Sequence, residues 1–395
     1  MGEAQVRQPS VTAQEANDAN PDGHTNGSIN QSPNPQPRRK LTSWIRIGIY
    51  AVFVLAGQSA GNLLGKLYYD KGGNSTWIGS FLQVAGFPIL LPYYLLPSRK
   101  NNNTRTEIST NTISSKSPSI FVLASFYMVL GLILAADCYF YSLGLMYLPV
   151  STYSLLCASQ LAFNALFSFF LNSQKFTFYI INSLVLLTTS SILLVFQSES
   201  EDTPNISKGK YVIGFICTVG ACAGYGLVLS LTQFLLNRIL KSESLSAIVD
   251  IIVFRSLVAS LGTLVGLFAS GEWKVLDEEM NSFRLGKLSY VMTLAWIAIT
   301  WKLFSIGSVG LIAEVSSLFS NGMSVSGFPI VPILAVFFFH EKMDGIKVMA
   351  MLLAIWGFTS YVYQKYLDDY GSRKESQNAI SETRTSPHRE REINV

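Results

Sequence analysis

The chain has 395 residues, of which 49% are hydrophobic and only 14% are charged. A soluble domain usually carries about 25% charged residues, so this composition argues against an ordinary soluble enzyme. The net charge of +4 does not indicate a nucleic-acid-binding protein, because the basic residues are not gathered in one soluble segment.

The two ends of the chain are polar. Residues 1–42 are rich in Asn, Pro, Gln and Ser, and residues 370–395 are similar. Such segments cannot bury enough apolar surface to fold, so we predict two disordered cytoplasmic tails. The first apolar segment follows Arg38, Arg39 and Lys40 and is predicted to be a retained helix rather than a cleaved signal peptide.

Between the tails, ten apolar segments reach the roughly 20 residues that a helix needs to cross a bilayer. They are 45–68, 76–97, 119–145, 149–171, 176–196, 210–236, 246–270, 288–310, 314–339 and 345–366. The sequence therefore predicts an all-α polytopic membrane protein with about ten transmembrane helices. With ten spans both termini lie on one side, which carries 18 Lys and Arg against nine on the other. This excess places both termini in the cytoplasm.

A shift of 163 residues reveals an internal similarity. Ser-Leu-Gly at 142–144 matches Ser-Ile-Gly at 305–307, and the shift places the predicted helices 3–5 over helices 8–10. Many transporters consist of two such halves in opposite orientation. We predict a first five-helix repeat at 43–200 and a second at 201–369, with chance similarity between apolar segments as the alternative.

Polar side chains inside the spans are candidates for function, because a polar group in hydrocarbon needs a partner or water. In the first helix, Gln58 and Asn62 lie beside a stripe of glycines. They either bond a neighbouring helix or face a central cavity. In the third helix, Asp137 is an isolated carboxyl with Tyr141 one turn later. Asp137 is a candidate for proton uptake, for a ligand contact or for pairing with a buried cation.

Further candidates lie in the later helices. Gln160 and Asn164 share one face of the fourth helix, Tyr225 lies among glycines in the sixth, and Asn321 lies in the ninth. Trp296 in the eighth helix is either a cavity residue or an interfacial anchor.

Three charged residues of the second half have several interpretations. Glu314 opens the predicted ninth helix, where it either favours the positive end of the helix dipole or takes part in proton coupling. Lys302 pairs with Asp137 or Glu314, or its amine reaches the membrane surface. Arg255 is interpreted as a structural or lipid-facing charge near the end of its span.

Two Gly-Phe-Pro sequences, at 86–88 and 327–329, are predicted to break the second and ninth helices. A broken helix exposes backbone groups that must line a cavity or find partners.

The sequence lacks the residue patterns of an enzyme. His24 and His388 lie in the tails and His340 in a loop, and the four cysteines lie in apolar segments without metal-ligand spacing to histidine. We therefore predict no catalytic residue, no metal and no cofactor, and an intramembrane enzyme such as a lipid transferase is disfavoured.

Several stretches resemble the plant purine permeases, a family of the drug/metabolite transporter superfamily. They are GNLLGKLYYDKGGNSTW at 61–77, QVAGFP at 83–88, YSLGLMYLPVSTYS at 141–154, QLAFNA at 160–165 and FHEK at 339–342. The resemblance covers about residues 45–366. It implies ten helices in two inverted five-helix halves, a central cavity, and proton-coupled uptake of adenine-type bases, cytokinins or related heterocycles. Family members differ in substrate, which includes alkaloids and vitamin-B6-like compounds.

The favoured hypothesis is a proton symporter for purine bases and derivatives such as adenine and cytokinins, placed in the plasma membrane. Its expected partners are a purine-like small molecule, the proton and the lipid bilayer, with no nucleic acid. Asp137 or Glu314 would take up the proton. The ligand would contact Gln58, Asn62, Tyr141, Gln160, Asn164, Tyr225, Trp296 and Asn321. The alternatives are a ligand-binding membrane receptor or scaffold without transport, and a permease for a different heterocycle.

Overall fold

The computed structural model describes residues 36–95, 119–173, 207–241 and 244–357, with short stretches between 178 and 193 and between 359 and 367. Most of both predicted tails, much of the span 176–196 and the end of the span 345–366 lie outside the described residues. The chain divides into two units, Met1–Leu41 and Thr42–Val395, and all contacts below lie within the second.

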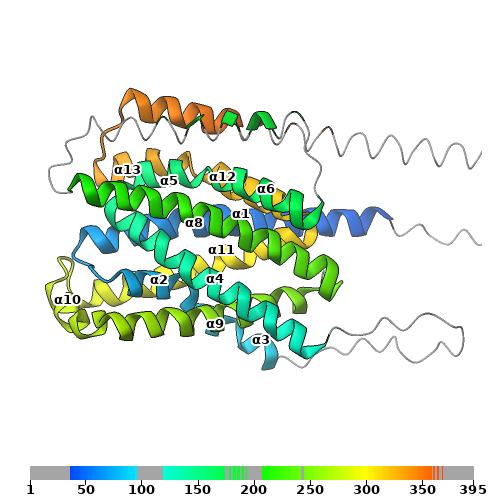
Figure 1. Ribbon diagram of the computed structural model, residues 1–395, viewed down its shortest axis with the longest axis horizontal. Helices are drawn as coiled ribbons and strands as arrows, with labels where there is room; N and C mark the ends of the chain where they lie inside the picture. The colour runs from blue at the N-terminus through cyan, green and yellow to red at the C-terminus, as the bar shows by residue number, and fades with distance from the viewer. Residues whose placement is uncertain are drawn as a thin grey trace, which may run out of the picture. The chain divides into compact units, whose positions relative to one another are not determined.

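Helices dominate the described part of the chain (Figure 1). They are α1 (Gln36–Asp70), α2 (Thr76–Ala85), η1 (Phe87–Leu90), α3 (Pro92–Leu95), α4 (Ile120–Tyr147), α5 (Val150–Cys157), α6 (Gln160–Asn172), α8 (Lys208–Phe234), the π-helix η2 (Leu235–Leu240), α9 (Leu245–Ser270), η3 (Glu272–Val275), α10 (Leu276–Ser282), α11 (Lys287–Glu314), α12 (Ser317–Gly327) and α13 (Ile330–Phe339). Helix α1 begins at Gln36, inside the segment predicted to be a tail.

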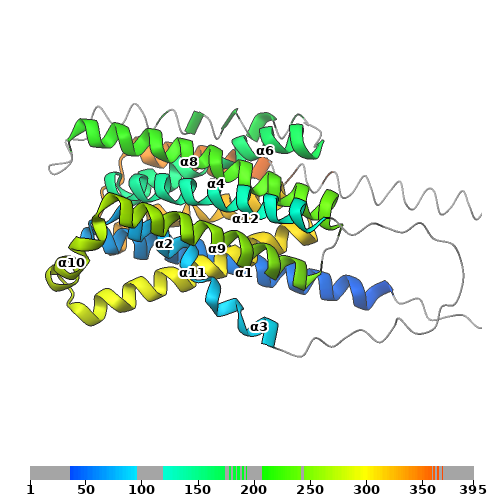
Figure 2. The same cartoon turned by 60° about the horizontal axis from the view of Figure 1, so that its bottom comes forward.

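Within the described residues, eight helical segments are long and apolar enough to cross a membrane. They correspond to eight of the ten predicted spans, and the tenth predicted span begins with a shorter apolar helix at Gly345–Gly357. Helix α4 packs on α8 and on α9, and α8 also packs on α6 (Figures 1 and 2). The prediction of an all-α polytopic membrane protein is confirmed, whereas the count of ten stays a prediction.

Both predicted helix breaks are confirmed. Helix α2 ends before Gly86, and the 3-10 turn η1 follows with Pro88 near its start. Helix α12 gives way to α13 at Phe328 and Pro329. A third break, between α5 and α6 at Ala158, was not predicted, because neither glycine nor proline marks it.

Glycines bring α1 and α11 into backbone contact. A Cβ atom on Gly57 would lie 2.6 Å from the Thr300 carbonyl oxygen and 2.7 Å from the Phe304 amide nitrogen. On the facing helix, a Cβ atom on Gly307 would lie 2.5 Å from the Tyr50 carbonyl oxygen. Small residues permit such close approach of transmembrane helices. The contact fixes the rotation of α1 and hence the direction of the neighbouring Gln58.

The predicted repeat stays a prediction, and two features agree with it. Gly144 and Gly307, which the 163-residue shift superimposes, both lie at tight helix–helix contacts: Gly144 of α4 packs on Thr218 of α8, and Gly307 of α11 packs on Val54 of α1. The two spans α5–α6 and α12–α13 are both broken near the middle.

A buried carboxylate, Glu279 of α10, holds the turn between α1 and α2 at one end of the bundle (Figure 1). Its oxygens accept hydrogen bonds from the Tyr68 hydroxyl at 2.5 Å, the Tyr290 hydroxyl at 3.0 Å, and the backbone amides of Asn74 at 3.1 Å and Ser75 at 3.3 Å. Such charge-assisted bonds are stronger than neutral ones. Glu279 therefore joins three helices at this end.

We predict that Glu279→Gln lowers the free energy of unfolding by about 2 kcal/mol, because an amide cannot accept on both sides and leaves buried donors unpaired. Thermal unfolding of the purified protein in detergent measures this. Glu278→Gln is the matched control, since Glu278 is exposed on the same short helix and should change stability little. Equal unfolding temperatures for the two variants would contradict the prediction.

A second carboxylate, Glu341, caps the N-terminus of α5 at the same predicted side of the membrane. It accepts from the amides of Val150 at 2.8 Å and Ser151 at 3.2 Å, a favourable site for a negative charge. The Lys66 amine donates to the Leu148 carbonyl at 2.9 Å just before α5 begins. The FHEK stretch thus fixes the start of the helix that leads into the central site.

Candidate functional site

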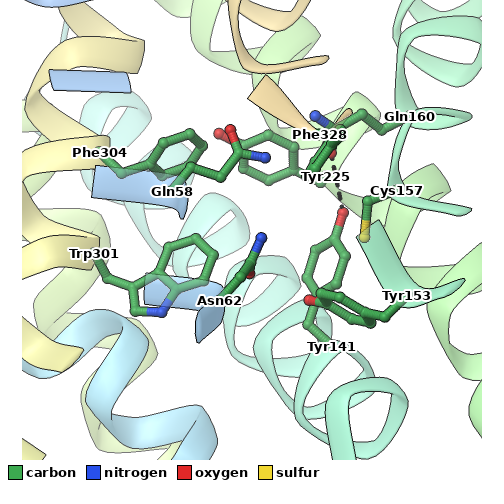
Figure 3. A pocket seen from close by; sticks show the side chains of 10 residues that line it. All are labelled: Gln58, Asn62, Tyr141, Tyr153, Cys157, Gln160, Tyr225, Trp301, Phe304 and Phe328. Atoms are coloured by element: carbon green, nitrogen blue, oxygen red, sulfur yellow. Dashed lines mark hydrogen bonds between the residues drawn. The ribbon is translucent and has the colours of Figure 1, made fainter. Parts of the chain in front are cut away.

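A cavity lies between α1, α4, α5, α6, α8, α11 and the junction of α12 with α13; we call it the central cavity (Figure 3). Its lining residues are Gln58, Asn62, Tyr141, Tyr153, Cys157, Gln160, Tyr225, Trp301, Phe304 and Phe328. It holds about 270 Å³ of empty space, its opening included.

Aromatic rings flank the amides of the central cavity. In Figure 3 the rings of Trp301 and Phe304 lie on one side, Tyr141 and Tyr153 lie on the other, and Asn62 lies between them. The Trp301 and Phe304 rings are perpendicular, with their centroids 5.4 Å apart. The Tyr141 and Tyr153 rings meet edge to face, with their centroids 6.1 Å apart. These faces can pack on a flat ring.

A chain of hydrogen bonds crosses the rim of the central cavity. The Tyr141 hydroxyl donates to Gln160 Oε1 at 3.2 Å, and Gln160 Nε2 donates to Ser324 Oγ at 3.0 Å. The Ser324 hydroxyl then donates to Gln58 Oε1 at 2.7 Å. The four side chains come from α4, α6, α12 and α1. The chain therefore connects both predicted halves and orients the two glutamine amides.

Asn62 lies one turn after Gln58 on α1 and differs from it in its hydrogen bonding. The Asn62 side chain is only 1% exposed, and its Oδ1 has no hydrogen-bond partner among the described residues. A buried amide without a partner costs free energy, which a ligand or water can recover. Asn62 thus carries unused hydrogen-bonding capacity in the wall of the central cavity.

A second cavity, which we call the Asp137 cavity, adjoins the central cavity. Its lining residues are Gln83, Val84, Leu134, Asp137, Cys138, Tyr141, Tyr225, Arg255, Trp301, Phe304 and Ser305. Four aromatic residues line both cavities, namely Tyr141, Tyr225, Trp301 and Phe304. These rings form the wall that the two cavities share.

Asp137 is buried, with 3% of its surface exposed, and its Oδ1 has no hydrogen-bond partner in the described part of the chain. The carboxyl rests directly on α8, where a Cβ atom on Gly224 would lie 2.6 Å from Oδ1. The glycine makes room for the carboxyl between α4 and α8. A charged carboxylate in such a place is costly unless a cation pairs with it.

Arg255 and Lys302, the cations within the predicted seventh and eighth spans, bind hydroxyl groups instead. Lys302 Nζ donates to Ser256 Oγ at 2.9 Å, and Arg255 Nη1 donates to Thr232 Oγ1 at 3.4 Å. Among the described residues, Lys302 forms no ion pair with Asp137 or Glu314. Of the two interpretations of Arg255, the lipid-facing charge was wrong, because the residue is 5% exposed, lines the Asp137 cavity and lies near the middle of α9 rather than near its end. The structural interpretation stays a prediction.

Five of the eight predicted binding residues line the central cavity: Gln58, Asn62, Tyr141, Gln160 and Tyr225.

The other three predicted binding residues do not line it. Asn164 joins helices, since its Nδ2 donates to the Ser317 carbonyl at 3.1 Å and its Oδ1 accepts from Ser230 at 2.8 Å. Asn321 Nδ2 donates to the carbonyl oxygen of a cavity residue, Gln160, at 3.1 Å.

Trp296 is 50% exposed, and Trp301, five residues later on α11, lines the cavity in its place. The residue pattern does not separate the two tryptophans, because apolar side chains occur on every side of α11. Ser324, Phe304 and Phe328 were likewise missed, since hydroxyl and phenyl groups are common in transmembrane helices.

Glu314 lies away from both cavities. Its carboxylate forms an ion pair with Arg46 Nε at 2.8 Å and accepts from Ser43 Oγ at 2.9 Å. The prediction that Glu314 opens the ninth helix was wrong, because it is the last residue of α11. Ser316 caps α12 by accepting from the Phe319 amide at 3.1 Å.

Comparison with known proteins shows which family the chain resembles. A family model for purine nucleobase transmembrane transport matches residues 45–370. The chain is 56% identical to the probable purine permease 10 of Arabidopsis thaliana over 347 residues, which is 88% of this chain and 87% of that protein. It is 53% identical to purine permease 21 of the same plant, over 88% of this chain and 87% of that protein. By the extent of both matches, the chain belongs to the family of purine nucleobase transmembrane transporters.

Proposed function

We propose that this protein carries adenine-type purine bases and their derivatives, including cytokinins, through the central cavity. The composition of the cavity wall supports this: within the described residues the wall consists of aromatic rings, amides, hydroxyls and a thiol, and contains no charged side chain. A neutral, flat, nitrogen-rich ring stacks on aromatic faces and bonds amides through its edge. Gln58, Asn62, Tyr141, Gln160 and Tyr225 are its proposed contacts.

We further propose that the transport is coupled to protons and that Asp137 carries the proton. The carboxyl is buried, lacks an ionic partner and is separated from the base only by the shared aromatic wall. Polar groups of this kind inside membranes mark ion or proton pathways. Glu314 is less suited to this role, because Arg46 already pairs with it outside both cavities. The excess of basic residues supports an orientation with both ends in the cytoplasm, and we propose the plasma membrane as the location.

The full chain in proteoliposomes tests the proposal. We expect radiolabelled adenine to accumulate inside when the outside is acidic, and unlabelled adenine or cytokinin to compete. Collapsing the gradient with a protonophore should leave only equilibration. Adenine binding without any uptake would instead establish a receptor, and uptake that ignores purines but accepts another heterocycle would overturn the substrate class.

A further inference from the structure

We infer that Gln58 presents a fixed hydrogen-bond donor to the substrate, and that Ser324 is the positioning residue that fixes it. This rests on the proposed function and adds one requirement: the substrate must offer a hydrogen-bond acceptor, such as a ring nitrogen without hydrogen, to Gln58 Nε2. Neither Ser324 nor this donor requirement follows from the residue types of the cavity alone.

The direction of the hydrogen-bond chain carries the inference. A hydroxyl has one hydrogen, and Ser324 gives it to Gln58 Oε1 at 2.7 Å. Ser324 in turn accepts from Gln160 Nε2 at 3.0 Å, and Gln160 Oε1 accepts from Tyr141 at 3.2 Å. Each group thus has its partner, and in the structure the chain runs in this one direction from Tyr141 to Gln58.

The end of this chain points to the substrate. With Oε1 occupied by Ser324, the free atom of the Gln58 amide is Nε2, which can only donate. Figure 3 shows the Gln58 amide among the side chains that line the central cavity. Gln58 is 4% exposed, so a substrate that lacks an acceptor there leaves the donor buried and unpaired.

Asn62 provides the contrast on the same helix. The Asn62 Oδ1 atom has no hydrogen-bond partner among the described residues, so no bond to that oxygen holds the amide in one orientation toward the substrate. The site therefore combines one fixed donor with one adaptable amide. Substrates that differ in donors and acceptors near Asn62 are tolerated, whereas loss of the acceptor that faces Gln58 is not.

Competition against radiolabelled adenine uptake in proteoliposomes tests the inference, with 1-deaza-, 3-deaza- and 7-deazaadenine as probes. Each probe replaces one ring nitrogen by a carbon. For the unaltered protein we expect at least one probe to compete about tenfold or more weakly than adenine. In Ser324→Ala the ratio between the competition by adenine and the competition by that probe should fall towards one, because the Gln58 amide is free to turn.

Two further variants make the result specific. Gln58→Leu removes the donor and should erase the same difference, which keeps the test valid if Ser324→Ala yields no folded protein. Ser326→Ala is the matched control on α12, because among the described residues that hydroxyl bonds only the Met323 carbonyl, at 2.6 Å, and the variant should keep the wild-type ratio.

The inference is overturned if all three probes compete as well as adenine, or if Ser324→Ala and Gln58→Leu both retain the wild-type ratio. Absence of adenine uptake by the unaltered protein is a separate result, which would refute the proposed function itself.

Discussion

Asp137→Asn is expected to abolish the accumulation of adenine against its gradient while adenine exchange continues. Asparagine keeps the shape of the side chain against Gly224 but cannot bind and release a proton. With one proton carried per base, each pH unit of gradient supports about tenfold accumulation of a neutral substrate. In proteoliposomes the wild type should approach that ratio, and the variant should stop at equal concentrations inside and outside.

The variant Glu314→Gln is measured in the same experiment to decide which of the two carboxyl groups carries the proton. Glu314 pairs with Arg46 away from both cavities, so its variant should still accumulate adenine when a pH gradient is applied. The reverse pattern, with Asp137→Asn accumulating and Glu314→Gln not, would assign the proton to Glu314. Exchange of labelled for unlabelled adenine shows in each case that the variant is folded and binds substrate.

Gly57→Ala is expected to destabilise the protein by about 3 kcal/mol, which is at the upper end for overpacking. The new methyl group would meet backbone atoms of Thr300 and Phe304 at 2.6 and 2.7 Å, and backbone cannot turn aside as a side chain can. Helix α1 must therefore move away from α11. Because Gln58 and Asn62 lie on α1, adenine uptake should fall together with the unfolding temperature.

Gly48→Ala is the matched control, since no atom lies within 4 Å of a Cβ atom at that position of the same helix. Alanine also favours helix over glycine, so this variant should be at least as stable as the wild type. Thermal unfolding in detergent and adenine uptake are measured for both variants. Equal stability of the two would show that the contact between α1 and α11 is not a constraint.

The class of fold could be predicted from the sequence because hydrocarbon imposes one simple requirement, a long apolar helix. The breaks at Pro88 and Pro329 were equally predictable, since proline lacks the amide hydrogen that a helix needs. The break at Ala158 was not, because it depends on how α5 packs among its neighbours.

Several site residues could be predicted because few polar side chains lie inside the spans. Polarity alone, however, did not separate the residues that line the cavity from those that bond other helices. Gln58 and Gln160 were found because an amide in a span needs a partner, and both reach the cavity. The same rule selected Asn164, whose partners are other helices. Trp296 and Trp301 could not be separated, since apolar residues on every side of α11 do not show which tryptophan is turned inward.

The aromatic wall shared by the two cavities has a thermodynamic consequence. A base that displaces the rings of Tyr225 or Trp301 also changes the space around Asp137, since these rings line both cavities. Linkage then requires reciprocity: the factor by which a bound proton alters the affinity for the base must equal the factor by which the base alters the affinity for the proton. A pH titration of adenine affinity and an adenine titration of proton release should therefore yield one and the same coupling constant.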